Sequence, residues 1–441
     1  MTTALRRSLG AVAGAALVFS GTAFAADAEP TPHGQEMYAA THWLAGQLAT
    51  AADVSAFDKA NPTVAGALVE NTLPGDAGAT DWHVTIDALL AFQATGTEKE
   101  AVGKIAAALP AHAESFIGPA GKRVAGAIAK ELIAAEKPTE FGSVNLIEEL
   151  GELMVSNPDS GEPTLDGKYG EASTNSDQAL AIIGLVKANV VPPAQAINFL
   201  RNQQCADGGF RLGGDDKPTC GPDEHSDAAT TALAMQALHD AFKLEEVEKP
   251  ATYLMTTQDA SGGFKDANDL NSAATGLAGQ ALWIAGKGDV AEKAADWVAS
   301  MQVTKDATKL SGDLGAIAFN KAALDDGLTN AKDGKIAATA RAKWRGWTAR
   351  AVLALTKTGL GHTAPALVLP SEQTETTTSS PTDTTTTTPT TTTTSSTDTS
   401  SSGSPNLADT GFSAPTGLLV GLALLVSGSA LVLLARRRTP Q

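Results

Sequence analysis

The stretch Thr231-Ala-Leu-Ala-Met-Gln-Ala-Leu238 is the clearest copy of a pattern that recurs along this chain. Segments that are small and apolar nearly all round are typical of buried helices. Because the pattern repeats, we interpret the chain as a repeat architecture. The other copies are Thr275-Gly-Leu-Ala-Gly-Gln-Ala-Leu282, Thr85-Ile-Asp-Ala-Leu-Leu-Ala-Phe92, Thr348-Ala-Arg-Ala-Val-Leu-Ala-Leu355 and, more weakly, 180–185 and 125–132.

A second pattern alternates with the first. In it, a bulky residue pair precedes a glutamine: Phe199-Leu200 before Gln204, Tyr253-Leu254 before Gln258, Trp297-Val298 before Gln302 and, one residue shorter, Trp43-Leu44 before Gln47. Segments 98–116 and 144–155 fill the two remaining places as helices. All the helices of this second set carry charges on one face, which places them outside the buried set. Two of them run into glycine turns, Asp207-Gly-Gly-Phe210 and Ser261-Gly-Gly-Phe264, where glycine permits the left-handed backbone that ends a helix.

About six buried and six amphipathic helices therefore alternate through residues 33–368. Six hairpins, each with a small apolar face, can close into a ring with the buried helices inside. The sequence predicts an all-α fold of this kind, an (α/α)6 toroid. An open solenoid is the alternative, and it would need distinct polar caps at its ends.

These motifs also carry a resemblance. An aromatic-Leu helix ending in Gln, an Asp-Gly-Gly-Phe turn and a Thr-Ala-x-Ala-x-x-Ala-Leu helix resemble the repeat of the prenyltransferase and squalene-cyclase superfamily. The resemblance covers most of residues 38–357 and is clearest from 176 to 302. It implies the toroid, but the superfamily spans terpene cyclases, protein prenyltransferases, cobalamin carriers and thioester domains, so it leaves the function open.

The chemistries of that superfamily fit this chain poorly. Asp215-Asp216 and Asp325-Asp326 lack the earlier aspartate of the cyclase acid motif. A prenyltransferase zinc site needs a free cysteine, whereas Cys205 and Cys220 lie in one loop and are expected to be bonded to each other. A thioester needs Cys-Gly-Glu-Gln, and 220–224 offers no glutamine. The cobalamin carriers add a β-domain, which is missing from this sequence. Terpene cyclase and prenyltransferase activities are therefore not expected.

The N-terminal segment is typical of a secretory signal peptide. Arg6 and Arg7 precede the apolar run 9–19, and Ala23-Phe-Ala25 is a small-x-small cleavage site. Residues 1–25 are interpreted as this signal peptide. Residues 371–405 are nearly all threonine and serine, with too little apolar content to fold, so we expect a disordered stalk.

The segment 407–438 resembles the LAxTG cell-wall sorting signal of actinobacterial surface proteins. Its pentapeptide is Leu407, Ala408, Asp409, Thr410 and Gly411, followed by the apolar run 412–435 and three arginines. Such a run can span a bilayer as a transmembrane helix, with the arginines at the cytoplasmic face. The resemblance implies cleavage by sortase between Thr410 and Gly411 and attachment to peptidoglycan. A plain membrane anchor is the alternative.

The charge of the chain is acidic. Its 32 basic residues include five arginines in segments 1–25 and 412–438, which contain no acidic residue, so the rest of the chain carries 27 basic against 49 acidic residues. A strongly acidic surface argues against nucleic acid as a partner.

Cys205 and Cys220 are the only cysteines, and in an exported chain they predict a disulfide, with two free thiols as the alternative. A loop of this length gains about 3 kcal/mol from the bridge. The loop and the turn after it collect acidic residues that could hold Ca²⁺ or another ligand. The alternative is a solvated acidic loop in which Asp227 caps the next helix. The candidate residues are Asp207, Asp215, Asp216, Asp223, Glu224, His225 and Asp227.

The sequence thus predicts a wall-anchored extracellular protein whose head binds a ligand or a wall component without catalysis. No catalytic residue and no certain cofactor is assigned. The alternative is a glycan-acting hydrolase or lyase that uses carboxylates near 223–227.

Overall fold

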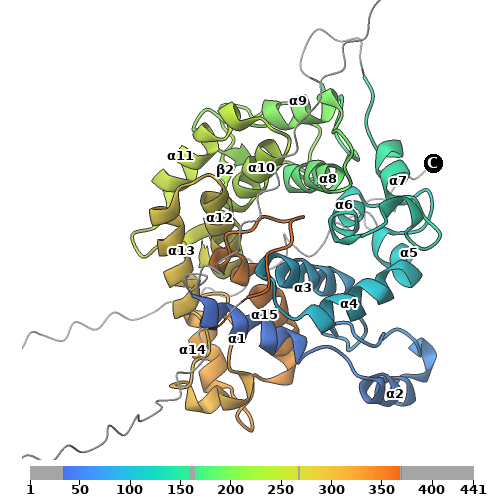
Figure 1. The fold of residues 1–441 in the computed structure, drawn as a ribbon, viewed down its shortest axis with the longest axis vertical. Coiled ribbons are helices and arrows are strands. Elements are labelled where there is room, and N and C mark those ends of the chain that lie inside the picture. Colours follow the sequence, from blue (N-terminus) through green and yellow to red (C-terminus); the bar gives the residue numbers. More distant parts are fainter. Residues whose placement is uncertain (1–32, 158–163, 267–268, 368, 370–441) are drawn as a thin grey trace, which may run out of the picture.

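The computed structural model describes residues 33–157, 164–266, 269–367 and 369. Within these residues, six helices form a closed inner ring in which each packs against the next and the last packs against the first (Figure 1). The closed toroid is thereby confirmed in preference to the open solenoid. The inner helices are α3 (Trp82–Thr95), α6 (Ala125–Ala134), α8 (Asn175–Lys187), α10 (Ala228–Asp240), α12 (Ser272–Ile284) and α15 (Ala338–Ala351).

An outer layer of helices surrounds this ring in the described part of the chain. It is formed by α1 (Gly34–Ala45), α4 (Lys99–Ala108), α5 (Ala113–Ile117), α7 (Leu146–Glu152), α9 (Ala194–Asn202), α11 (Glu248–Thr257) and α13 (Gly288–Ser300). The helix expected over 98–116 is divided, because Pro110 lies in the 3-10 turn η2 (Leu109–His112) between α4 and α5. The helix expected over 144–155 is shorter, since the side chain of Asn145 caps α7 by accepting from the N–H of Ile147 at 3.2 Å.

The remaining elements are short and peripheral. Two helices, α2 (Ala51–Ala60) and α14 (Lys321–Thr329), lie outside the repeat pattern. Antiparallel hairpins pair β1 (Phe210–Arg211) with β2 (Ser226–Asp227) and β3 (Phe264–Asp266) with β4 (Asp269–Asn271). Further 3-10 turns are η1 (Pro62–Val64), η3 (Pro138–Glu140), η4 (Leu244–Glu246), η5 (Thr308–Asp313) and η6 (Val352–Leu355).

The recurring threonine fixes the register of the inner helices. In four of them its hydroxyl accepts the N–H of a residue that lies 11–31 positions earlier in the chain, at 2.8–2.9 Å. A buried N–H without a partner would cost free energy, and the threonine supplies the acceptor that this N–H needs. Corresponding positions of these helices therefore lie at one level of the ring. The four bonds join Thr85 to Leu73, Thr231 to Phe210, Thr275 to Phe264 and Thr348 to Ile317.

The recurring glutamine joins neighbouring outer helices. Gln258 donates from Nε2 to the carbonyl oxygens of Gly262 and of Val290 in α13, at 2.9 and 3.0 Å. Gln302 makes the equivalent bonds to Gly315 and to Glu36 of α1, which joins the last part of the ring to the first. The backbone at Gly262 has φ 98°, and a Cβ there would meet the carbonyl oxygen of Lys293 at 2.2 Å, so this turn requires glycine.

The segment from Thr356 to Leu367 crosses the ring at the C-terminal ends of the inner helices, where it lies in front of them in Figure 1. The amide of Gln280 donates to the carbonyl oxygen of Thr358 at 2.7 Å, and the amide of Gln236 donates to that of Leu360 at 3.0 Å. On the far side, Ala364 N–H donates to Gln93 O at 2.9 Å. One face of the ring is therefore covered, and the N-terminal ends of the inner helices form the other face.

The predicted signal peptide, the stalk and the LAxTG segment lie outside the described residues. No helix within the described ranges has both the length and the apolar character needed to cross a membrane.

Candidate functional site

The predicted disulfide is present. Cys205 and Cys220 are bonded, with their Cα atoms 5.1 Å apart. The loop that they close surrounds the buried side chain of Arg211, which donates to Asp215 Oδ2 and Glu224 Oε1, each at 3.0 Å. Burial opposes ionisation of these carboxyls, but the bonds from Arg211, Lys217 and nearby N–H groups outweigh it and hold the pKa of both below their ordinary values. Two of the candidate carboxylates thus neutralise a buried guanidinium.

The other candidate residues do not converge on one point. Asp207 accepts from Ser226 Oγ at 2.6 Å, and Asp227 caps α10 by accepting from Thr230 N–H at 2.7 Å. The side chains of Asp216, Asp223 and His225 are exposed. Within the described ranges, no three of the seven candidate residues bring ligand atoms close enough to share an ion. The Ca²⁺ site at this loop stays a prediction, and these contacts favour the alternative in which the loop is structural.

The inner wall of the ring carries an ionic cluster that is not among the candidate residues predicted from the sequence. Asp87 of α3 is bonded to Lys130 of α6 at 2.5 Å and to Arg350 of α15 at 2.9 Å. Because the two cations come from the helices on either side of α3, the three groups meet on the inner face of the ring. The side chains of Lys130 and Arg350 keep 17% and 26% of their exposure, so solvent reaches this level of the interior.

The uncovered face of the ring, at the N-terminal ends of the inner helices, is called the mouth below. The cluster makes one side of this mouth cationic. Burial opposes ionisation of Asp87, but Lys130 and Arg350 lower its pKa to about 2, so it is ionised at neutral pH. Asp87 neutralises one of the two cations, which leaves the cluster with one net positive charge. One turn earlier on α3, His83 is exposed, and its ring lies edge-on to that of Phe116 at 4.5 Å. The net positive charge of the cluster suits an anionic or polar ligand.

The rest of the wall at this level is apolar. Asp87 and Arg350 each lie two residues after the recurring threonine, where α10 and α12 carry Leu233 and Leu277. One turn nearer the mouth, the same helices carry only small residues, Ala229 and Ala273. The mouth therefore joins a charged side on α15, α3 and α6 to an apolar side on α10 and α12.

Two acidic residues, Asp227 and Asp266, belong to strands that pack against α10. Asp266 ends β3, which packs against α10, and it is half-buried on the same face of the hairpin as Phe264. Burial, and then the charge of Asp227, raise the pKa of Asp266 above its ordinary value. The phenol of Tyr253 donates to the carbonyl oxygen of Ser226 at 3.0 Å, which holds β2 against α11. Asp227 was a sequence candidate, whereas Asp266 was missed because it lies in the next repeat.

Aromatic side chains gather on the neighbouring part of the ring. The rings of Phe319 and Trp347 lie 5.5 Å apart, and those of Trp344 and Trp347 lie 5.9 Å apart. The carbonyl oxygen of Phe319 accepts from Ser272 N–H at 2.7 Å, which places this cluster beside the first turn of α12. Aromatic residues make up only 5% of the sequence, but the fold brings three of them to one place.

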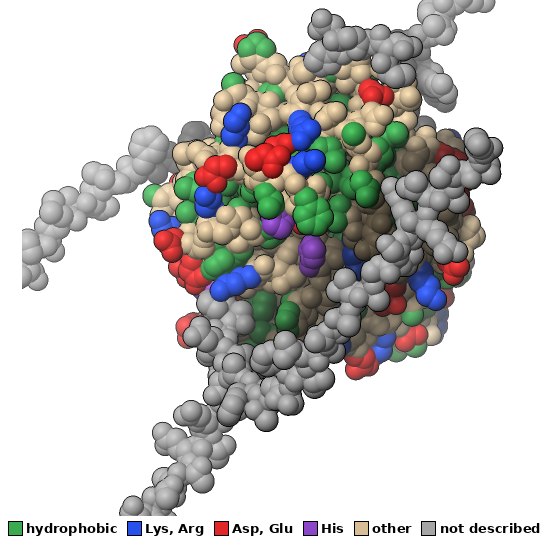
Figure 2. Space-filling view, turned by 45° about the horizontal axis from the view of Figure 1, so that its top comes forward, with side chains coloured by type: hydrophobic (Ala, Val, Ile, Leu, Met, Phe, Trp, Pro, Cys, Tyr) green, Lys and Arg blue, Asp and Glu red, His purple; other side chains and the backbone are tan. Residues whose placement is uncertain are grey.

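The covered face differs in character. There a shallow pocket of about 210 Å³ includes Lys187, Asp240 and His362 among its lining residues. Phe242 and Val191 are 84% and 88% exposed in the loops that follow α10 and α8. Figure 2 shows hydrophobic side chains grouped beside histidines on one face of the molecule.

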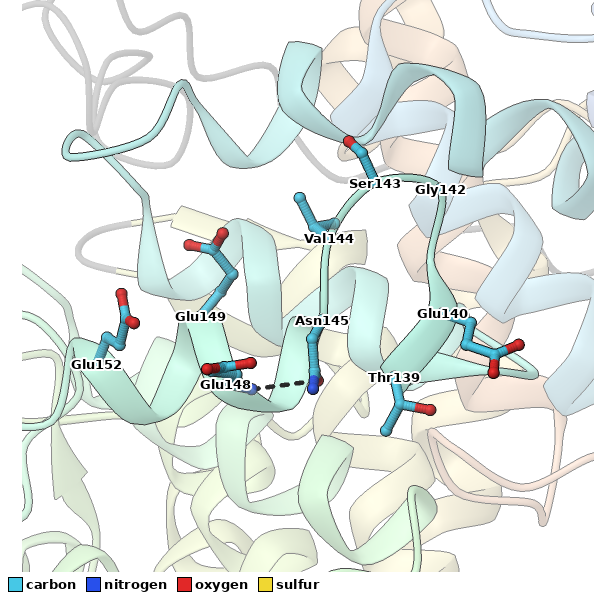
Figure 3. A pocket seen from close by; sticks show the side chains of 9 residues that line it. All are labelled: Thr139, Glu140, Gly142, Ser143, Val144, Asn145, Glu148, Glu149 and Glu152. Atoms are coloured by element: carbon cyan, nitrogen blue, oxygen red, sulfur yellow. Dashed lines mark hydrogen bonds between the residues drawn. The ribbon is translucent and has the colours of Figure 1, made fainter.

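A wider pocket of about 550 Å³ lies on the outside of the ring, between η3 and α7 (Figure 3). Glu140, Glu148, Glu149 and Glu152 help to line it, but their carboxylates do not converge. Glu149 is paired with Arg123 at 2.8 Å. We assign no site to this pocket.

Comparisons with known proteins show similarity in fold only. No family model matches the chain, and no curated protein matches it. Among solved structures, it is similar to the unsaturated glucuronyl hydrolase of Bacillus sp. GL1, with 12% identity, 75% of this chain and 99% of that chain covered, and a TM-score of 0.44. A possible member of the GH105 family from Salmonella enterica gives 14% identity, 75% and 95% coverage, and a TM-score of 0.44. The ent-copalyl diphosphate synthase of Streptomyces platensis has 14% identity, with 63% of this chain and 52% of that chain covered and a TM-score of 0.36. Similarity at this level concerns the arrangement of helices alone.

Proposed function

We propose that the head is a glycan-acting hydrolase or lyase that works at the N-terminal mouth of the ring. The observation that supports this most is the position of Asp266, half-buried at the end of β3 where this strand packs against α10, the helix that Asp227 caps. Burial and then the charge of Asp227 raise the pKa of Asp266, which favours its protonated form. Cleavage of a glycosidic bond uses two carboxyl groups, one protonated to donate to the leaving oxygen and one ionised to act as base or nucleophile. Asp266 takes the first role in this proposal and Asp227 the second.

The surroundings suit a sugar chain with acidic groups. Aromatic faces such as that of Trp347 can pack against the apolar faces of sugar rings, and Lys130 with Arg350 supplies positive charge across the mouth. The covered opposite face leaves the N-terminal mouth as the entry to the ring.

Replacing Asp266 with Asn is expected to lower turnover at least about 100-fold, because the general acid is lost. Asp227→Asn is expected to have an effect of similar size, while α10 still folds, since asparagine caps helices as well as aspartate does. The measurement is the release of new chain ends from acidic and neutral polysaccharides. Asp269→Asn is the matched control, because this exposed aspartate lies opposite Asp266 in the same hairpin. Equal rates in the parent and in both variants would rule out this acid–base pair.

A binding role without catalysis is the second candidate. It is favoured by the helix-capping bond of Asp227, which already gives that carboxylate a structural function. In this case the parent protein retains a glycan but releases no product, and Asp227→Asn keeps much of the affinity.

For the location, we propose export, sortase cleavage and attachment to peptidoglycan, with the stalk holding the head away from the wall. The support is the order of segments in 1–25, 371–405 and 407–438. Mass spectrometry of fragments released by a muramidase is expected to find the chain ending at Thr410 and linked to a wall peptide. A mature chain that retains 412–435 would instead identify a plain membrane anchor.

A further inference from the structure

Three ligand-type side chains meet on the outer layer, away from both faces of the ring. His33, just before α1, places Nε2 at 3.3 Å from Glu292 Oε1 and 3.4 Å from Asp296 Oδ1. The ligand atoms of all three residues lie within 4.8 Å of one another. No other group of three histidine, cysteine or acidic side chains in the described ranges converges in this way.

The local structure explains why these residues come together. Glu292 and Asp296 are four residues apart on α13, so they lie on the same face of that helix. The bonds from Gln302 Nε2 to Glu36 O and Gly315 O bring the start of α1 against the end of α13. The imidazole of His33 is 15% exposed, while Asp296 is 70% exposed, so the group is held from one side and open to ions from the other.

We propose that His33, Glu292 and Asp296 form a Zn²⁺ site. Zinc–ligand bonds of about 2.0–2.1 Å in a tetrahedron place neighbouring ligands about 3.3–3.4 Å apart. The two imidazole–carboxylate distances, 3.3 and 3.4 Å, match this edge. One imidazole with two carboxylates is a donor set for zinc rather than for Ca²⁺, which takes six to eight oxygen ligands. Water completes the fourth position.

A bound ion at this site would join the first and last parts of the ring. His33 belongs to the first described segment and α13 to the last complete hairpin, so a shared ion links the two ends of the repeat array. It adds to the bonds of Gln302 at the same junction. Because the ion binds only the closed arrangement, it stabilises the folded head by mass action.

The test uses the full-length chain in detergent, stripped with EDTA and titrated with Zn²⁺ alone by calorimetry. We expect one tight site per chain and a rise in unfolding temperature of several degrees on saturation, roughly what a bound ion gives at 100 times its dissociation constant. Co²⁺ in place of Zn²⁺ is expected to give the visible absorption of a tetrahedral site. Both cysteines are disulfide-bonded, so no thiol competes for the metal.

His33→Ala and, separately, Glu292→Gln are each expected to weaken zinc binding at least about 10-fold. His42→Ala is the matched control, because His42 also pairs with a carboxylate, Glu98 at 3.3 Å, but has no second one. Circular dichroism confirms that each variant is folded, and the Glu292 variant serves if the His33 variant is not. A parent chain without a tight site, or equal affinity in the parent and both variants, would show that the three residues form an ion pair only.

Discussion

Replacing Asp313 with alanine is expected to destabilise the head by about 3–5 kcal/mol, the usual cost of leaving a buried charge without its partner. Asp313 is fully buried, yet it accepts from Trp43 Nε1 at 2.8 Å and from the N–H of Ile336 at 2.6 Å. The guanidinium of Arg341 donates to both carboxylate oxygens, at 2.7 and 3.0 Å. The substitution would leave the indole of Trp43 and the N–H of Ile336 without their acceptor, and it would remove the carboxylate that neutralises the guanidinium of Arg341.

Urea unfolding of the parent and the variant measures the difference. Asp325→Ala is the matched control, because Asp325 is paired with Lys321 on the surface of α14 and both side chains are more than half exposed. Exposed pairs of this kind contribute at most about 1 kcal/mol. If both substitutions have effects of this smaller size, the network around Asp313 does not hold α1, η5 and α15 together.

The repeat pattern was enough to predict the ring. The threonine that begins the inner-helix pattern and the glutamine that ends the outer-helix pattern each bond to backbone groups. The residues that recur in the sequence are therefore the ones that make the recurring hydrogen bonds. The Asp313 network could not be predicted in the same way. It joins Trp43, an aromatic position of the second pattern, to Asp313 and Arg341, which lie outside both repeated patterns, so the repeats do not reveal this contact.

The candidate site was predicted less well. Proximity in sequence suggested the loop between Cys205 and Cys220, but its carboxylates bond to Arg211 or to nearby backbone. A usable signal was present in the repeats themselves. At the third position of the pattern, where leucine is expected, Asp87 and Arg350 carry charges. Charged residues at positions that the pattern reserves for the wall of the ring are the ones that the fold brings together.

Replacing Glu131 with glutamine is expected to stabilise the head at neutral and alkaline pH. Glu131 lies on α6 and is fully buried, and neither of its carboxylate oxygens has a hydrogen-bond partner in the described part of the chain. Burial raises its pKa to about 8, although the charge of Arg123 acts in the opposite direction. The folded protein therefore keeps Glu131 protonated where the unfolded chain would ionise it. Glutamine has nearly the same shape and no charge to bury.

The pH dependence separates this explanation from ordinary packing. Because the pKa of Glu131 is raised in the folded state, this residue does not lower the free energy of unfolding below about pH 4.5. Its destabilising effect grows from there to about pH 8 and is constant above that pH. Each pH unit is worth about 1.4 kcal/mol, so the variant should exceed the parent by roughly 4–5 kcal/mol at pH 8 and by almost nothing at pH 4.5. Urea unfolding across this range measures the difference, with Glu136→Gln as the control because Glu136 is exposed two residues after α6 ends. A gain that is the same at every pH would show that the carboxyl is not protonated in the folded state.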